Sequence, residues 1–205
     1  MSTVRADLRS YYEEEARLAA RGPLRGRRLE LRAQFVELLV AEQRSSVIDF
    51  GAGPGRDAVG FHDAGISYVG LDLAHGNGVI AAQSDTIVMQ ASIDAPPLRQ
   101  ASFDAGWSMS TLMHVPDPDV PTALKALVAP LAPGAPMLFG LWGGTVGDHI
   151  DERGLDGQRR LFSLRGLDRN RELFKSIGHV EREELWDVGD RSGWEYQVFL
   201  MRISS

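Results

Sequence analysis

Three glycines at alternate positions, Gly51, Gly53 and Gly55, follow an apolar segment that contains Asp49. Glycine lets the backbone approach a ligand closely because it has no Cβ. A helix that begins directly after such a turn points its free N–H groups at the ligand. Asp72 ends the next apolar segment, about twenty residues on, where a carboxylate can accept the hydroxyls of a ribose. This spacing predicts a site for a cofactor that contains ribose.

Two familiar glycine motifs fit this turn poorly. A dinucleotide site of the form G-x-G-x-x-G requires a third glycine where this chain has Arg56, and a phosphate-binding P-loop requires a Lys-Ser/Thr pair that is absent here. Asp72 suits NAD as well as other ribosyl cofactors. From the residues alone, a nicotinamide-dependent oxidoreductase therefore stays an alternative.

Strand and helix patterns alternate after the first 45 residues, which themselves read as two amphipathic helices. The expected strands are 46–50, 67–73, 86–90, 103–110, 136–142, 180–186 and 194–203. The last two are separated by a turn too short for a helical crossover, so they should pair antiparallel. The pattern predicts an α/β fold with a doubly wound, mostly parallel seven-stranded sheet and an antiparallel last strand.

The domain organisation follows from the same pattern. We expect a single domain over residues 1–205, in which helices of 1–45 cover a core of 46–205. The segment 143–166 is long for a connection between a strand and a helix, and long connections are often functional. It is predicted to be a lid loop over the substrate.

Composition narrows the possible partners and the compartment. The chain has no cysteine and a formal charge of −6, which excludes thiolate chemistry and argues against nucleic acid. It shows neither a signal-peptide pattern nor an apolar run long enough for a bilayer, so a cytoplasmic protein without a membrane partner is expected. Asp148, His149 and Asp151 suggest a metal only weakly, and no metal site is predicted. A monomer or a homodimer would be compatible with the sequence.

Six segments, in order, resemble the motifs of the class I S-adenosylmethionine-dependent methyltransferases, in the small-molecule subfamily called methyltransferase type 11. They are VIDFGAGPG, YVGLDL, VMQASIDAPPL, FDAGWSMSTLMHVPD, LVAPLAPGAPMLFGLW and FKSIGHVEREELW. Any one of these motifs is loose, but six in sequence are specific. The resemblance implies a Rossmann-like fold and S-adenosyl-L-methionine as the cofactor.

The resemblance also assigns cofactor contacts to particular positions. The implied set is Asp49, Gly51, Ala52, Gly53, Gly55, Asp72, Leu73, Ser92, Ile93 and Ser108. Residues 51–53 would pass under the methionine portion, and the backbone of Ser108 would meet its amine. Leu73 and Ile93 would cover the two faces of the adenine. Many relatives hold the adenine amino group with an aspartate where this chain has Ser92, so that contact is expected to differ.

S-adenosylmethionine carries an activated methyl group, so an enzyme of this kind needs only to align the nucleophile and to remove a proton from a hydroxyl or an ammonium. His114, just past the fourth strand, is a candidate base, although it could equally shape the pocket. Tyr12, in the first helix, is the second candidate. The predicted function is methyl transfer to O or N of a small molecule, such as a natural-product intermediate. A non-catalytic S-adenosylmethionine-binding protein is the other alternative.

Overall fold

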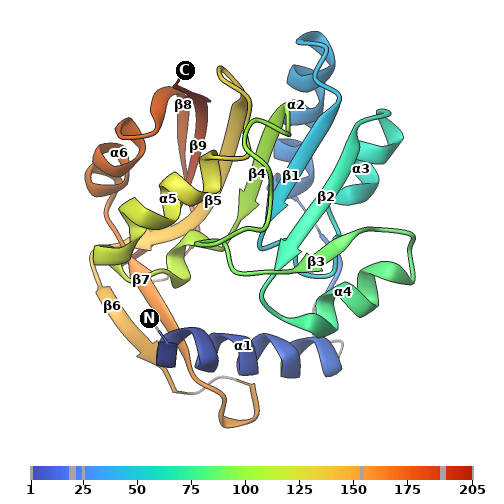
Figure 1. Ribbon diagram of the computed structural model, residues 1–205. Helices are drawn as coiled ribbons and strands as arrows, with labels where there is room; N and C mark the ends of the chain where they lie inside the picture. The colour runs from blue at the N-terminus through green and yellow to red at the C-terminus, as the bar shows by residue number, and fades with distance from the viewer. Residues whose placement is uncertain (1, 19–21, 25, 153–154, 190–192, 205) are drawn as a thin grey trace.

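The computed structural model describes residues 2–18, 22–24, 26–152, 155–189 and 193–204. Its main sheet has seven strands in the order β3-β2-β1-β4-β5-β9-β8 (Figure 1). The strands are β1 (Ser46–Phe50), β2 (Ser67–Asp72), β3 (Val88–Gln90), β4 (Ala105–Met109), β5 (Pro136–Gly144), β8 (Gly178–Trp186) and β9 (Trp194–Ile203). The first five run parallel, while β9 is antiparallel to both β5 and β8. The predicted doubly wound sheet with an antiparallel last strand is confirmed.

Helices cover both faces of this sheet, which explains why its central strands are apolar along their whole length. On one face lie α2 (Arg27–Ala41) and α3 (Ala58–Asp63), whose Phe35 and Phe61 pack with Trp107 of β4. On the other lie α5 (Val120–Val128) and α6 (Leu167–Lys175), where Phe174 stacks on Phe139 of β5. The two cores hold the strand ends in fixed positions.

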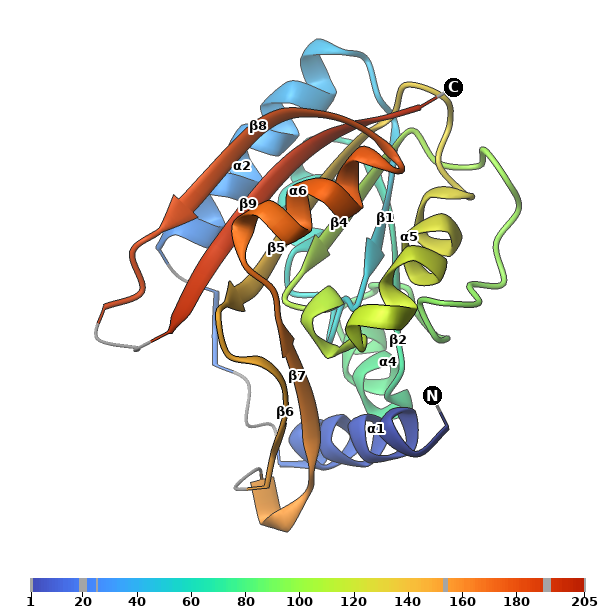
Figure 2. The same ribbon diagram turned by 90° about the vertical axis from the view of Figure 1, so that its left-hand side faces the viewer.

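The first helix, α1 (Ser2–Arg17), lies on neither face. It crosses the end of the sheet toward which the arrows of β1 and β2 point, beside α4 (His75–Ala82) (Figure 1). The view from the side places the strands β6 and β7 next to it (Figure 2), and α1 packs against both α4 and β7. The helix therefore covers the edge where ligands of open α/β sheets bind.

The segment 143–166 is a β-hairpin rather than the loop expected from the sequence. Strand β6 (Gly147–Asp151) pairs antiparallel with β7 (Arg160–Leu164), and the short helix η3 (Leu155–Gly157) lies in the connection. Phe162 and Leu164 of β7 are buried against Met113. This tertiary burial favours strands where the local pattern is too short to indicate them. No helix among the described residues is long and apolar enough to span a membrane.

Candidate functional site

A cavity of about 110 Å³ lies between α1 and the carboxyl ends of β1, β2 and β4. We call it the central cavity. Its floor is formed by Gly51, Asp72 and Ser110, from the turns that follow these three strands, and its roof by Leu8 and Tyr12 of α1. The sheet topology thus brings three loops and one distant helix to a single place.

Only the first of the three glycines lines the central cavity. Gly51 has a φ of +76°, and a Cβ there would lie 2.0 Å from Oγ1 of Thr111, so no other residue fits without displacing the neighbouring loop. Ala52 instead packs on Gly70 of β2, and Gly55 approaches the residues before β3. These two of the predicted positions shape the turn rather than the cavity surface.

The Asp72 carboxylate is 8% exposed and is held by three N–H donors. It accepts hydrogen bonds from the backbone N–H of Gly53 at 2.8 Å, from that of Ala74 at 2.9 Å, and from the side-chain amide of Asn77 at 3.0 Å. Gly53 therefore serves the site indirectly, by fixing Asp72. A carboxylate offers about four acceptor positions, so this one can accept a further donor at the edge that lines the central cavity.

Asp49 lies beneath the glycine turn and is 1% exposed. The Tyr68 hydroxyl donates a hydrogen bond to it at 2.7 Å. Burial, together with the nearby charge of Asp57, raises the pKa of Asp49 to about 8. Asp49 does not line the central cavity, and its contacts lie beneath the glycine turn.

The third loop lies beside β3. Leu73, Ser92 and Ile93 all line the central cavity. The Ser92 hydroxyl donates to Asp94, whose other oxygen pairs with Arg5 of α1. Sequence reasoning missed Asp94 because it examined only the position directly after the strand. An acid two residues later was the available signal.

Ser108 does not reach the central cavity. It is 2% exposed, and its hydroxyl donates to the carbonyl of Phe50 in the neighbouring strand at 3.0 Å. The cavity wall is formed instead by Met109 and Ser110, which follow it. The contact expected from the Ser108 backbone stays a prediction.

His114 and Tyr12 meet, although they are far apart in the sequence. The Tyr12 hydroxyl lies 2.7 Å from Nε2 of His114, and Nδ1 of His114 lies 2.7 Å from the carbonyl oxygen of Leu161 in β7. A carbonyl oxygen can only accept, so Nδ1 carries the proton and Nε2 accepts from the phenol. The structure brings together the two predicted catalytic candidates as a hydrogen-bonded pair at the wall of the central cavity.

A buried arginine that the sequence did not suggest positions this histidine. Arg165, at the end of β7, donates to the carbonyls of Leu112 at 2.9 Å and Val115 at 3.1 Å, on either side of His114. Burial lowers the pKa of Arg165 to about 10, so it remains a cation at neutral pH. Arg165 and the Leu161 carbonyl together fix the loop that presents His114.

Within the described ranges, no three His, Cys, Asp or Glu residues gather as metal ligands do. Two of the residues that weakly suggested a metal have other partners. Asp148 accepts a hydrogen bond from Ser163, and Asp151 pairs with Arg160 at 3.3 Å. Both acids therefore connect the two strands of the β6–β7 hairpin.

Comparison with known proteins agrees with this geometry. A family model described as a methyltransferase domain matches residues 47–134. The matched range contains the glycine turn, Asp72, Asp94 and His114. A malonyl-[acyl-carrier protein] O-methyltransferase of Pseudescherichia vulneris is 34% identical over 119 residues, which cover 54% of this chain and 45% of that protein. The chain spans less than half the length of the curated relatives it matches.

Solved structures share the fold. The 1,6-didemethyltoxoflavin-N1-methyltransferase of Burkholderia thailandensis has a TM-score of 0.73 at 18% identity and covers 100% of this chain and 88% of its own. The [4+2]-cyclase SpnF has a TM-score of 0.64 at 15% identity and covers 84% of this chain and 80% of its own. The motif order, the family match and the shared fold together support a class I S-adenosylmethionine-dependent methyltransferase.

Proposed function

We propose that the central cavity binds S-adenosylmethionine and that the protein transfers the methyl group to an oxygen or nitrogen of a small molecule. One observation carries the proposal: the cavity combines a ribose acceptor, an adenine pocket and a hydrogen-bonded Tyr–His pair under one helix. The Burkholderia relative in fold acts on a small molecule, 1,6-didemethyltoxoflavin, which favours the same class of acceptor here.

The residues present fit the cofactor by their chemistry. Asp72 offers a carboxylate edge to the ribose hydroxyls, and Asp94 offers one to the adenine amino group. Leu73 and Ile93 provide apolar surface for the flat base. When bound, the cofactor supplies a methyl group activated by its sulfonium. Among the described residues, Asp94 thus takes the role that relatives give to an aspartate at the position of Ser92.

The α1 helix must move for the whole cofactor to enter. The central cavity encloses about 110 Å³, below the roughly 300 Å³ at the lower end of ligand pockets. Glu13 fastens α1 to the start of α4, where it accepts hydrogen bonds from the N–H groups of His75 at 2.7 Å and Gly76 at 2.9 Å. These contacts suit a lid that opens for the ligand and closes again.

The Tyr12–His114 pair can remove the proton of the acceptor. A phenol that donates to His114 still has lone pairs for a second partner, so the acceptor can donate to Tyr12. As the acceptor gives up its proton to the Tyr12 oxygen, the Tyr12 proton moves to Nε2 of His114. The Leu161 carbonyl then stabilises the resulting imidazolium through Nδ1–H.

The test is methyl transfer from S-adenosylmethionine labelled in the methyl group to a fractionated extract of small metabolites. Tyr12→Phe and His114→Gln are each expected to lower the rate at least about 100-fold, since general-base catalysis contributes that much. His179→Gln, on the outer strand β8, is the matched control and should leave the rate unchanged.

Two outcomes would contradict parts of the proposal. Full activity of both variants would show that the pair only shapes the cavity. No labelled product with any fraction, despite binding of S-adenosylhomocysteine, would favour the non-catalytic alternative. The fold alone does not decide between them, because a [4+2]-cyclase shares it.

A further inference from the structure

A second cavity, of about 570 Å³, is lined by Met113, the neighbour of His114 in the sequence. We call it the hairpin pocket. Its walls come from the β6–β7 hairpin, from Trp142 in β5 and from Trp194 in β9. Met113 lines the hairpin pocket, while the next residue, His114, lines the central cavity. The two cavities therefore share one turn of chain as their common wall.

Aromatic rings dominate this pocket. Trp194 makes edge contacts with Trp142, His149 and Phe162 at centroid distances of 5.8, 5.7 and 5.2 Å. His149 stacks on Phe162 at 5.5 Å with an interplanar angle of 15°. The Phe162 ring also lies 5.2 Å from the ring of His114. Such an array favours a flat, apolar ligand, because aromatic side chains offer large rigid surfaces for stacking.

One fixed cation sits among these rings. The guanidinium of Arg160 lies 4.7 Å from the Phe162 ring centroid and 4.3 Å from that of Tyr11 in α1. Its Nε pairs with Asp151 at 3.3 Å. Its two terminal nitrogens make no hydrogen bond with any other residue that the structure describes, and Arg160 lines the pocket. These N–H groups are therefore available to an acceptor atom on a ligand.

We propose that the hairpin pocket binds the methyl acceptor, and that this acceptor is a planar aromatic molecule with an anionic or carbonyl edge directed at Arg160. The proposal rests on the function proposed above and names the substrate class of that site. The rings of Trp142 and Trp194 contact the flat body of the ligand. Arg160 fixes its orientation through paired N–H donors, the geometry that guanidinium offers to carboxylates and carbonyls.

A cationic acceptor is the other ligand class that an aromatic pocket attracts, and two contacts oppose it. Arg160 already occupies the faces of Phe162 and Tyr11, so a second cation would be repelled. The acid closest to the rings, Asp151, already pairs with Arg160. Glu152 is 75% exposed and lies at the outer rim. The orientation of an anionic or carbonyl edge thus depends on the two terminal nitrogens of Arg160.

The experiment titrates two aromatic probes, 2-naphthoate and benzyltrimethylammonium, into the full chain by calorimetry, with and without saturating S-adenosylhomocysteine. We expect 2-naphthoate to bind more tightly than the cation. Arg160→Gln and Trp194→Leu should each weaken its binding by about tenfold or more, the usual effect of losing a charged hydrogen bond or a large aromatic contact. S-adenosylhomocysteine affinity should change little.

The controls keep the outcomes separate. Arg182→Gln, which breaks an ion pair with Glu184 on β8, should leave 2-naphthoate binding intact. Arg160→Lys retains the charge but not the planar fork, and should give an intermediate affinity. Tighter binding of the cation, or no binding of either probe by protein that binds S-adenosylhomocysteine, would overturn the acceptor proposal alone. Failure of S-adenosylhomocysteine to bind would instead contradict the proposed function.

Discussion

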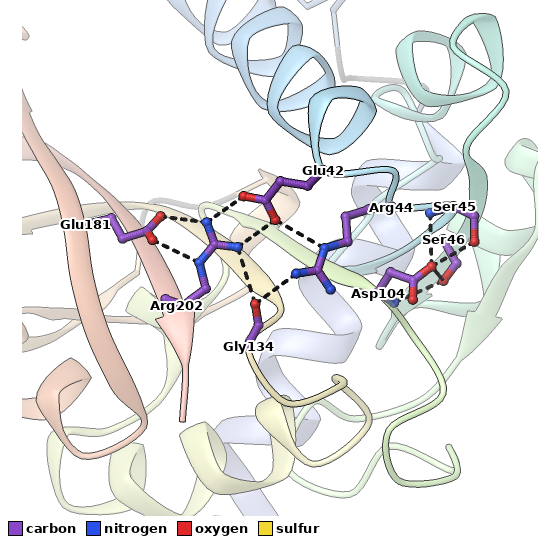
Figure 3. A network of polar contacts seen from close by, with 8 residues as sticks. All are labelled: Glu42, Arg44, Ser45, Ser46, Asp104, Gly134, Glu181 and Arg202. Carbon is purple, nitrogen blue, oxygen red and sulfur yellow. Dashed lines mark hydrogen bonds and ion pairs between the residues drawn. The ribbon is translucent and has the colours of Figure 1, made fainter. Parts of the chain in front are cut away.

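Two buried acids at the carboxyl end of the sheet, Asp49 and Asp72, have different partners from the acids at the opposite end. At the end away from α1, Arg202 bonds both Glu42 and Glu181, and Arg44 bonds Glu42 and the Gly134 carbonyl (Figure 3). At the carboxyl end, Asp49 and Asp72 are almost fully buried. Neither of them forms an ion pair with another described residue, and their hydrogen bonds come from neutral N–H and O–H donors.

The charged residues around Arg202 connect secondary-structure elements, whereas the two buried acids lie at the end of the sheet where ligands bind. A carboxylate paired with arginine has its charge balanced and contributes modestly to stability. A buried acid without a cation depends on neutral hydrogen-bond donors instead, and such groups are concentrated at functional sites. The carboxyl end should therefore respond to substitution with lost binding, and the opposite end only with lost stability.

The largest expected effect is that of Gly51→Ala. The new Cβ would collide with Thr111, and the residue would have to keep a φ of +76°, so the floor of the central cavity must shift. We expect S-adenosylhomocysteine affinity to fall by at least about 100-fold, that is by about 2.7 kcal/mol, in calorimetry. Gly65→Ala is the matched control, because Gly65 has a φ of +73° with nothing within 4 Å of a Cβ. Equal losses in both variants would mean that backbone strain alone is responsible.

Asp72→Asn compares the two ends directly. Asp72 accepts three hydrogen bonds at the site, and Asp104 accepts three from Ser45 and Ser46 at the opposite end (Figure 3). Asp72→Asn and Asp104→Asn should each lower the free energy of unfolding by about 1–3 kcal/mol. Only Asp72→Asn should weaken S-adenosylhomocysteine, by about tenfold or more. Comparable affinity in the two variants would exclude Asp72 as the ribose acceptor.

Asp49→Asn should change how stability depends on pH. The pKa of Asp49 is raised from 3.8 to about 8 in the folded protein, so between these values the folded state holds a proton that the unfolded state has lost. Stability of the wild type therefore falls as pH rises from about 4 to about 8. The variant lacks this contribution, so its stability should fall less than that of the wild type between pH 4 and pH 8. If the stability of the wild type and that of the variant depend on pH in the same way in chemical denaturation, the raised pKa of Asp49 is refuted.

Glu13→Gln tests the attachment of the lid. The substitution removes the carboxylate that accepts from the first N–H groups of α4, a contact of the capping type worth about 1 kcal/mol. Hydrogen exchange in α1 should become about fivefold faster, while exchange in β1 and β4 stays the same. Glu14→Gln, which breaks only an exposed pair with Arg17, is the control. Unaltered exchange in α1 would show that Glu13 does not hold the lid.

The smallest effect is expected at the opposite end. Arg202→Met removes the centre of the network in Figure 3, whose partners Glu42 and Glu181 are only partly buried. We expect a loss of about 1 kcal/mol of unfolding free energy, smaller at high salt, and no change in S-adenosylhomocysteine affinity. A drop in that affinity would mean that the two ends are coupled.

The sequence was informative wherever a local pattern determines the structure. Alternating apolar and helical segments, closed by turns such as the one at Gly65, indicated the doubly wound, mostly parallel sheet and its antiparallel last strand. The glycine turn and Asp72 were found because their spacing reflects one strand–turn–helix unit. Tyr12 and His114 were each proposed singly.

Non-local contacts could not be predicted in this way. The Tyr12–His114 bond joins residues that are 102 positions apart. Arg165, which follows β7, donates hydrogen bonds to the loop that contains His114. The hairpin is stabilised because Phe162 is buried against Met113. At the end of β4, the residues that line the central cavity are Met109 and Ser110, which a single sequence does not indicate. These features depend on tertiary packing, which a single sequence does not display.

Calorimetric titration of the wild-type protein with S-adenosylhomocysteine and, separately, with NADH tests the central claim most directly. The central cavity should bind S-adenosylhomocysteine in the micromolar range and should not bind NADH, since Arg56 stands where a dinucleotide motif needs its third glycine. Tight binding of NADH without any response to S-adenosylhomocysteine would contradict the assignment of the cavity to S-adenosylmethionine.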